Sequence, residues 1–200
     1  MNLQDIKQKA LNEHIPILMD ATLEVIKKIL IEEKPKRILE IGTATGYSSI
    51  CFAQILLENC KGEHCSSVII DTIELDEQRA NEAIDNINKL GLENNIKVLK
   101  GNAVEILPTL NDKYDIIFID AAKGKYPIFL QEAIRLSHKG SIILADNILY
   151  KGYVMSDYNK HKQRTAVTHL REYIKETTEN PNLETEILEV GDGLAISKNV

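Results

Sequence analysis

The sequence predicts an α/β fold in which a mostly parallel sheet is covered by helices on both faces. Short runs that are apolar throughout alternate with stretches whose apolar residues recur at helical spacing. Such strands, separated by helices, are typical of parallel sheets that are buried on both faces. The C-terminal part differs, because two strand-like runs follow each other across Gly191-Asp192-Gly193, which predicts a hairpin and an antiparallel last strand.

The N-terminal third of the chain predicts three helices and one strand. Residues 3–12 have a helical pattern. Asp20 is suited to be the N-cap of a second helix that runs to about residue 33, and Pro35 ends it. Residues 37–41 then predict a strand and residues 46–57 a helix.

The remaining elements continue the alternation. We expect strands over 68–73, 96–99, 116–119 and 141–145, and helices over 77–90, 103–110 and 126–137. Gly91 ends the first of these helices. A long helix over 158–178 precedes the hairpin strands, 184–189 and 194–197, which gives seven strands in all.

Composition narrows the class of protein. The 200 residues fit one domain, and the net charge of −6 argues against nucleic acid covering the whole surface, although a local basic patch remains compatible with it. No apolar run approaches the ~18 residues that a membrane helix needs. The N-terminal residues are polar and include no apolar segment of the kind found in signal peptides, so we expect no secretion signal. The odd number of cysteines suits a reducing compartment, so we expect a cytoplasmic protein without membrane contact.

Polar residues follow the predicted strands where the strands end. Asp120 follows 116–119, and Asp146 and Asn147 follow 141–145; Glu74 and Gly42 occupy the same position after two earlier strands. In an open α/β sheet, ligands bind outside the carboxyl ends of the strands. These residues therefore form a candidate site for oxygen-ligated groups, although acids at such positions also serve as helix caps or turn residues.

The first strand leads into Gly42-Thr43-Ala44-Thr45-Gly46, whose glycines are not spaced as in dinucleotide-binding proteins. Gly42 allows close approach of a ligand, and the helix that starts at Gly46 directs its positive end toward a carboxylate. A tight turn without a ligand is the alternative. Glu74 is suited to accept hydrogen bonds from both hydroxyls of a ribose, or is simply the first acid of a helix. Together these features describe a nucleoside that carries an amino-acid carboxylate.

Four stretches together resemble a known family: RILEIGTATGYSSICFA, DTIELDEQRANEAIDNINKLGL, YDIIFIDAAKGKY and IILADNILYKG. The chain is similar to class I S-adenosylmethionine-dependent O-methyltransferases, in the divalent-metal group that includes catechol and caffeoyl-CoA O-methyltransferases. The resemblance implies a Rossmann-like, seven-stranded methyltransferase sandwich in a single domain, 1–200. Residues 1–34 would be N-terminal helices, 35–147 the cofactor- and metal-binding core, and 148–200 the substrate side with the C-terminal hairpin.

The resemblance also implies roles for individual residues. S-adenosylmethionine would be bound by nine positions: Met19, Glu40, Gly42, Gly46, Ser48, Glu74, Asn102, Ala103 and Asp120. Asn102 stands where many relatives carry an acid that reaches the adenine amino group; it keeps a carbonyl acceptor but lacks the charge.

Metal binding and catalysis are implied in the same way. Asp120, Asp146 and Asn147 would bind Mg²⁺ or another divalent cation through oxygen atoms. Lys123 and Asp120 would be the catalytic residues, with Lys123 beside the reacting hydroxyl, where it takes the proton or stabilises the oxyanion.

Within the group, the chain resembles the bacterial tRNA 5-hydroxyuridine methyltransferases, which form 5-methoxyuridine at the wobble position. The resemblance rests on EIGTATGYS, DNILYKGYV and HKQRTAVTHLREYI. Residues 151–171 are also rich in cations, namely Lys151, Lys160, Lys162, Arg164 and Arg171, against the single acid Asp157. We expect tRNA to be bound there, with Lys151, Lys162 and Arg164 as candidate contacts. A solvated helix face with a mobile loop is the alternative.

Other functions stay open at this point. The main alternative is methylation of a small catechol or phenolic metabolite or of an acyl-CoA phenol, although Ala195 replaces the acid with which the catechol enzymes hold the second hydroxyl. An NAD-dependent oxidoreductase lacks the third glycine of its fingerprint. A non-catalytic RNA-binding module conflicts with the presence of Asp120, Lys123, Asp146 and Asn147.

Cys60, His64 and Cys65 offer too few ligands for zinc and predict a loop insertion instead. The family resemblance further implies a homodimer.

Overall fold

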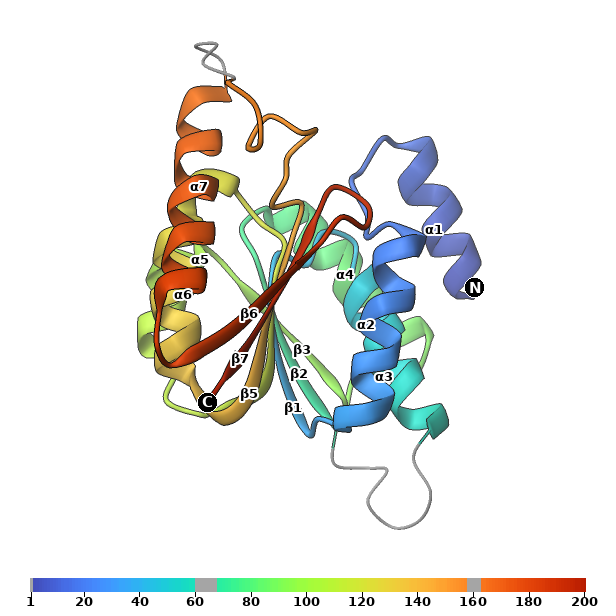
Figure 1. Cartoon of the computed structure of the whole chain (residues 1–200). Helices are drawn as coiled ribbons and strands as arrows, with labels where there is room; N and C mark the ends of the chain where they lie inside the picture. Colours follow the sequence, from blue (N-terminus) through green and yellow to red (C-terminus); the bar gives the residue numbers. More distant parts are fainter. Residues whose placement is uncertain (1, 60–67, 158–162) are drawn as a thin grey trace. The chain divides into compact units, whose positions relative to one another are not determined.

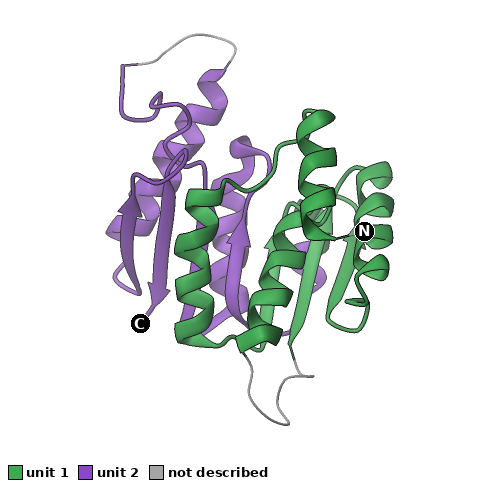
Figure 2. Cartoon of the chain, turned by 90° about the vertical axis from the view of Figure 1, so that its right-hand side faces the viewer, with its two compact units in different colours: residues 1–106 green, residues 107–200 purple. Residues whose placement is uncertain are grey.

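The computed structural model describes residues 2–59, 68–157 and 163–200. These residues form two compact units, Met1–Ile106 and Leu107–Val200, which are coloured separately in Figure 2. Each unit combines strands and helices and is described by itself below.

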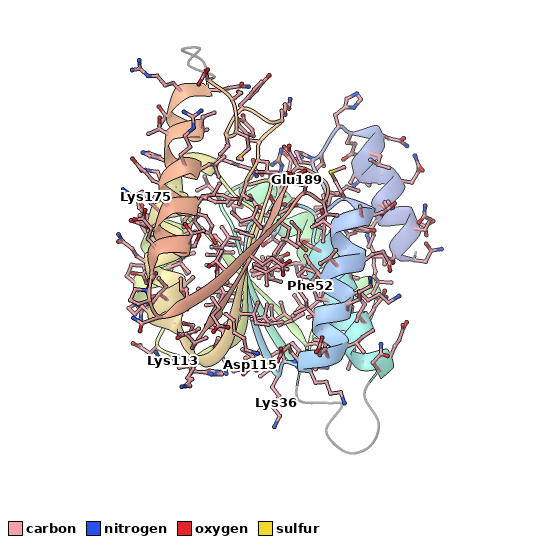
Figure 3. All side chains as sticks on the ribbon, in the orientation of Figure 1. Lys36, Phe52, Lys113, Asp115, Lys175 and Glu189 are labelled. Atoms are coloured by element: carbon pink, nitrogen blue, oxygen red, sulfur yellow. The ribbon has the colours of Figure 1, made fainter. Side chains whose placement is uncertain are left out.

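The first unit contains the elements α1 (Leu3–Asn12), α2 (Asp20–Glu33), β1 (Arg37–Ile41), α3 (Tyr47–Asn59), β2 (Ile69–Glu74), α4 (Glu77–Lys89), β3 (Ile96–Lys100) and α5 (Ala103–Ile106), labelled in Figure 1. The three strands are parallel, with β2 between β1 and β3. Because Ile41 pairs with Ile73 and Glu74 with Lys100, the carboxyl ends of β1 and β2 lie close together. The helix α3 is buried over most of its length, and its Phe52, labelled in Figure 3, is 1% exposed.

The second unit contains η2 (Leu107–Thr109), β4 (Tyr114–Ile119), η3 (Lys123–Lys125), α6 (Tyr126–Leu136), β5 (Ser137–Asp146), α7 (Arg164–Glu179), β6 (Leu183–Leu188) and β7 (Leu194–Asn199). β4 and β5 are parallel, and β7 is antiparallel to both β5 and β6. The hairpin of β6 and β7 is drawn in red in Figure 1. The strand order β3-β2-β1-β4-β5-β7-β6 confirms the predicted seven-stranded, mostly parallel sheet with an antiparallel C-terminal strand.

Several element boundaries differ from those predicted. Met19, not Asp20, is the N-cap of α2; Asp20 is the first helical residue, and its carboxylate pairs with Lys7. The helix predicted over 103–110 ends at Ile106 and continues only as a short 3₁₀ turn, because Pro108 restricts the residue before it and donates no backbone hydrogen bond. The strand predicted over 141–145 begins four residues earlier, at Ser137.

The turn between β6 and β7 is tied to the segment that follows β5. The backbone N–H groups of Ile148 and Leu149 donate to the carbonyl oxygens of Gly193 and Asp192, both at 3.0 Å, and the Lys151 N–H donates to the Asp192 carboxylate. These contacts fix residues 148–151, which directly follow the predicted metal ligand Asn147.

No helix in the described parts of the chain is both long and apolar enough to cross a membrane.

The close approach of Gly193 to Leu149 gives a testable prediction about stability. A Cβ added at Gly193 (φ +91°) would lie 2.4 Å from Leu149 Cγ, whereas one added at Gly140 (φ +92°) would meet nothing within 4 Å. Gly140→Ala should therefore lower the free energy of unfolding by about 1 kcal/mol through backbone strain alone. Gly193→Ala should cost about 1–3 kcal/mol more, because the overlap with Leu149 adds to that strain. Urea unfolding curves of the two variants check this, and equal losses would contradict the packing argument.

Candidate active site

The predicted site residues fall into two groups, one in each unit. The candidate cofactor-binding residues, apart from Asp120, belong to the first unit. The candidate metal ligands and Lys123 belong to the second.

The glycine-containing loop follows β1 and has an unusual backbone. Gly42 (φ +108°), Ala44 (φ +47°) and Gly46 (φ +83°) all adopt positive φ, and Ala44 does so although it carries a Cβ. The N–H groups of Gly42 and Thr43 both donate to the carbonyl oxygen of Ile73, at 3.0 and 3.2 Å, which ties the loop to the end of β2. A strained loop held by backbone bonds at the N-terminus of a 13-residue helix, α3, is suited to bind an anionic group.

Glu40 lies beneath this loop and is fully buried. One carboxylate oxygen accepts a hydrogen bond from Ser48 Oγ, and the other accepts from Thr72 Oγ1 at 2.6 Å. Thr43 Oγ1 lies 2.6 Å from Thr72 Oγ1; since the single proton of Thr72 is given to Glu40, Thr43 must donate to Thr72. The carboxylate of Glu40 therefore holds both ends of the loop, Ser48 directly and Thr43 through Thr72.

Glu74 is the last residue of β2 and is largely buried. Its two carboxylate oxygens accept from the backbone N–H groups of Ala44, at 2.8 Å, and Asp76, at 2.9 Å. Each carboxylate oxygen has a further lone pair, so these bonds are compatible with the predicted contacts to ribose hydroxyls.

The other predicted cofactor contacts also lie in the first unit. Asn102 accepts a hydrogen bond from the N–H of Val104 at 3.1 Å and donates to Glu105 at 3.1 Å, so it serves as a local cap for α5, which begins at Ala103. Met19 precedes α2 and is 49% exposed. Their contact with a cofactor stays a prediction.

In the second unit, four predicted residues come together at the carboxyl ends of β4 and β5. Lys123 Nζ donates to Asp120 Oδ1 at 3.1 Å and to Asn147 Oδ1 at 2.7 Å. Asp146 Oδ1 accepts from the backbone N–H of Asn147 at 2.8 Å. The Lys123 ammonium group thus bridges Asp120 and Asn147, two of the three predicted metal ligands. The third, Asp146, accepts a hydrogen bond from the backbone of Asn147.

Burial makes the carboxyl group of Asp146 a weaker acid than usual. Its side chain is 1% exposed, and this desolvation, with a smaller contribution from the nearby Asp120 carboxylate, raises the pKa of Asp146 to about 7. The Asn147 N–H and the Lys123 ammonium act in the opposite direction. Burial and the Asp120 carboxylate both disfavour the ionised form of Asp146, and a cation bound beside it would stabilise that form.

The three ligands fit a hard divalent cation by their chemistry. Asp120, Asp146 and Asn147 offer only oxygen atoms, the donors that Mg²⁺ prefers. The Lys123 ammonium contacts two of them, which shows that the oxygens of Asp120 and Asn147 converge on one cationic group. Within residues 2–59, 68–157 and 163–200, no group of three or more His, Cys, Asp or Glu side chains is placed to hold a metal. Cys60, His64 and Cys65 lie outside the described residues.

The predicted RNA contacts are only partly described. Lys151 and Arg164 are exposed, and Lys162 lies outside the described residues. Arg171, counted among the cations of this segment, is engaged elsewhere: its guanidinium donates to the carbonyl oxygens of Tyr153, Val154 and Ser156. Arg171 therefore fastens the segment after Lys151 to α7.

Three hydrogen bonds that hold the loops and strand ends around the candidate site could not be predicted from the sequence. The hydroxyl of Thr72, the phenol of Tyr126 and the guanidinium of Arg171 each bind groups that are distant in sequence. Only Tyr126 carries a local signal, because it begins a helix with Pro127 in the first turn, three residues after Lys123.

Comparison with known proteins identifies the family. The sequence profile of the O-methyltransferase family matches residues 3–200. A catechol O-methyltransferase from Mycobacterium tuberculosis is 31% identical over 168 residues, which cover 81% of this chain and 71% of that protein. The catechol O-methyltransferase of Niastella koreensis is 38% identical over 126 residues, which cover 61% of this chain and only 53% of that protein, so the match spans about half of its length.

Solved structures agree with this result. An O-methyltransferase from Bacillus cereus, in complex with SAH, has a TM-score of 0.85 at 25% identity and covers 99% of this chain and 90% of its own. A Staphylococcus aureus protein, provisionally described as a caffeoyl-CoA O-methyltransferase, has a TM-score of 0.88 at 32% identity, with 100% and 93% covered. The chain therefore belongs to the O-methyltransferase family, and the predicted class of enzyme, an S-adenosylmethionine-dependent O-methyltransferase, is confirmed.

The contribution of the hydrogen bonds from Thr43 to Thr72 and from Thr72 to Glu40 can be tested with a matched pair of variants. Thr72 and Thr22 are both fully buried in the first unit, but Thr22 Oγ1 has no hydrogen-bond partner in the described part of the chain. Thr72→Val should lower the free energy of unfolding by about 1–3 kcal/mol, because it leaves a buried carboxylate with one donor fewer. Thr22→Val should leave stability unchanged or raise it. Chemical denaturation measures both, and a loss for Thr22→Val as large as that for Thr72→Val would contradict the assignment.

Arg171 can be tested in the same way against Lys175, an exposed cation of the same helix that is labelled in Figure 3. Arg171→Met should accelerate backbone hydrogen exchange in residues 153–157 roughly tenfold, because charged hydrogen bonds to three carbonyl groups are lost. Lys175→Met should leave this segment unchanged. Unchanged exchange in Arg171→Met would show that Arg171 does not hold the segment.

Proposed function

We propose that this chain transfers a methyl group from S-adenosylmethionine to a hydroxyl group held at the cluster of Asp120, Lys123, Asp146 and Asn147. The observation that carries the proposal is the bridging ammonium of Lys123, 3.1 Å from Asp120 and 2.7 Å from Asn147, beside a buried carboxyl group at Asp146. Three oxygen donors would hold a divalent metal ion, which supplies activation of a hydroxyl, and an adjacent lysine can accept the hydroxyl proton.

Binding of S-adenosylmethionine is supported by the loop at Gly42–Gly46 and by Glu74. The loop and the N-terminus of α3 would receive the carboxylate of the methionine part, and Glu74 would accept from the ribose hydroxyls. The Bacillus cereus relative is in complex with SAH, the demethylated form of this cofactor. Glu40 contributes by fixing the loop through Ser48 and Thr72.

The residues of the chain would then act as follows. When bound, the divalent cation lowers the pKa of the acceptor hydroxyl and the cofactor supplies a methyl group on a positively charged sulfur. Asp120, Asp146 and Asn147 hold the cation. Lys123 would take the hydroxyl proton or stabilise the oxyanion that forms. Fixing the acceptor oxygen supplies much of the rate.

For the acceptor, we propose the 5-hydroxyuridine of tRNA at the wobble position, which would give 5-methoxyuridine. The support is the family resemblance of the sequence, together with the exposed Lys151 and Arg164. The use of Arg171 in holding the chain removes one cation from this argument. A cytoplasmic location and a homodimer stay predictions.

A small catechol, a phenolic metabolite or an acyl-CoA phenol is the second candidate acceptor. It is favoured by the relatives from Mycobacterium tuberculosis and Niastella koreensis, both of which are catechol O-methyltransferases. The two candidates share one chemistry, since each presents an acidic hydroxyl beside a second oxygen that a cation can hold.

The deciding experiment measures methyl transfer from labelled S-adenosylmethionine to tRNA that carries 5-hydroxyuridine, and in parallel to catechol and caffeoyl-CoA. We expect 5-methoxyuridine to form with Mg²⁺ and not with excess chelator. Asp146→Ala should reduce the rate at least about 100-fold through loss of a ligand, and Lys123→Met by about 10²–10⁴-fold through loss of acid–base catalysis.

Asp115→Asn is a suitable control, because Asp115 lies near the other end of β4, is labelled in Figure 3, and pairs with His138. This variant should keep wild-type activity. Product on catechols alone would replace tRNA by the second candidate. No product on any acceptor, from a preparation that binds S-adenosylmethionine, would refute the proposed reaction on these acceptors.

A further inference from the structure

Tyr126 is a fully buried residue that lies directly behind the cluster of Asp120, Lys123, Asp146 and Asn147. It begins α6, three residues after Lys123. Its hydroxyl group lies 2.8 Å from the carbonyl oxygen of Asp146 and 3.3 Å from that of Ile119. A phenol buried this deeply needs hydrogen-bond partners. The two carbonyl groups belong to neighbouring strands, and the backbone of Ala121 also forms a hydrogen bond with the phenol.

The position of the two carbonyl groups is specific. Ile119 is the last residue of β4 and immediately precedes Asp120, whereas the carbonyl of Asp146 forms the peptide bond to Asn147. One hydroxyl proton is therefore shared between the two peptide bonds from which the candidate ligands project. The phenol bridges the ends of β4 and β5, next to the place where Ile119 pairs with Ala145 in the sheet.

The ring of Tyr126 extends this contact to Lys123. Lys123 Nζ lies 5.7 Å from the ring centroid, within range of a cation–π interaction. On another side the ring packs edge-on against Tyr173 of α7, with centroids 5.6 Å apart and planes at 71°. Because packing against Tyr173 holds the Tyr126 ring in place, the ring also fixes the position of its own hydroxyl group and offers a fixed surface to the Lys123 ammonium.

We propose that Tyr126 is a positioning residue for the reaction, which fixes the spacing of the oxygen donors of Asp120, Asp146 and Asn147 and the direction of Lys123. This inference rests on the proposed function of the cluster. The competing explanation is that Tyr126 only fills the core. The two differ in what the hydroxyl group does, because core packing is a property of the ring.

Tyr173 supplies a matched control for that difference. It is also fully buried in the second unit and touches the Tyr126 ring, but its hydroxyl group has no hydrogen-bond partner among the residues that the structure describes. Replacing either tyrosine by Phe removes one buried oxygen atom and keeps the ring. Only at Tyr126 does the change remove a bond to the strand ends.

The experiment measures Mn²⁺ binding by calorimetry to the full chain, without acceptor, for wild type, Tyr126→Phe and Tyr173→Phe. Tyr126→Phe should weaken binding roughly tenfold, as is usual when a residue that orients metal ligands is lost, and Tyr173→Phe should match wild type. In the methylation assay, Tyr126→Phe should lower kcat, with little change in KM for S-adenosylmethionine. Equal Mn²⁺ affinity of Tyr126→Phe and wild type would overturn the inference and leave the proposed function intact.

A second measurement separates local from global effects. Hydrogen exchange at 10 °C in Tyr126→Phe should be faster in residues 119–123 and 146–149 only. Acceleration spread over the whole second unit would overturn the positioning role, since it would show a general loss of packing. Wild-type protein that binds no Mn²⁺ would refute the proposed metal cluster itself, and the inference with it.

Discussion

The burial of carboxylate groups at the ends of parallel strands is the constraint on which the candidate site depends. An ionised carboxylate in the interior must receive hydrogen bonds or positive charge, or it becomes neutral. Glu40 meets this requirement with donated hydroxyl protons from Ser48 and Thr72. Asp146 receives a backbone N–H and lies near Lys123, yet burial still raises its pKa to about 7. The carboxylate of Glu40 is therefore stabilised by hydrogen bonds within the protein. The ionised form of Asp146 would be stabilised further by a bound cation.

Much of the fold and the site follows from local sequence patterns. Asp120, Asp146 and Asn147 could be predicted as one cluster because parallel strands bring their carboxyl ends together, whatever the details of packing. Thr72 and Tyr126 could not, because their partners come from other strands and no periodicity encodes which carbonyl or carboxylate a hydroxyl meets. The N-cap of α2 was misplaced by one residue because Asp20 suits either position, and its partner, Lys7, lies in another helix.

Arg171 shows why a count of charges overstates what a surface offers. In the sequence it belongs to a basic stretch that suggests a phosphate-binding face. In the structure its guanidinium donates to three carbonyl groups of the segment 153–156 and holds that segment on α7. A cation that is used internally contributes positive potential but not a free donor. The RNA-binding interpretation therefore depends on Lys151, Arg164 and residues outside the described part of the chain.

Buried hydroxyl groups in this protein differ by what they hold. Within residues 2–59, 68–157 and 163–200, the hydroxyl oxygens of Thr22 and Tyr173 have no hydrogen-bond partner, although both side chains are as deeply buried as Thr72 and Tyr126. The hydroxyl groups of Thr72 and Tyr126 act at strand ends, one below the loop after β1 and the other between the ends of β4 and β5. Cores are stabilised mainly by apolar contacts, which are not directional and so do not fix the backbone at the point where a loop leaves a strand. Directional bonds at the strand ends restrict that freedom where the reactive groups are placed, so they fix the geometry of the site in addition to what they contribute to stability.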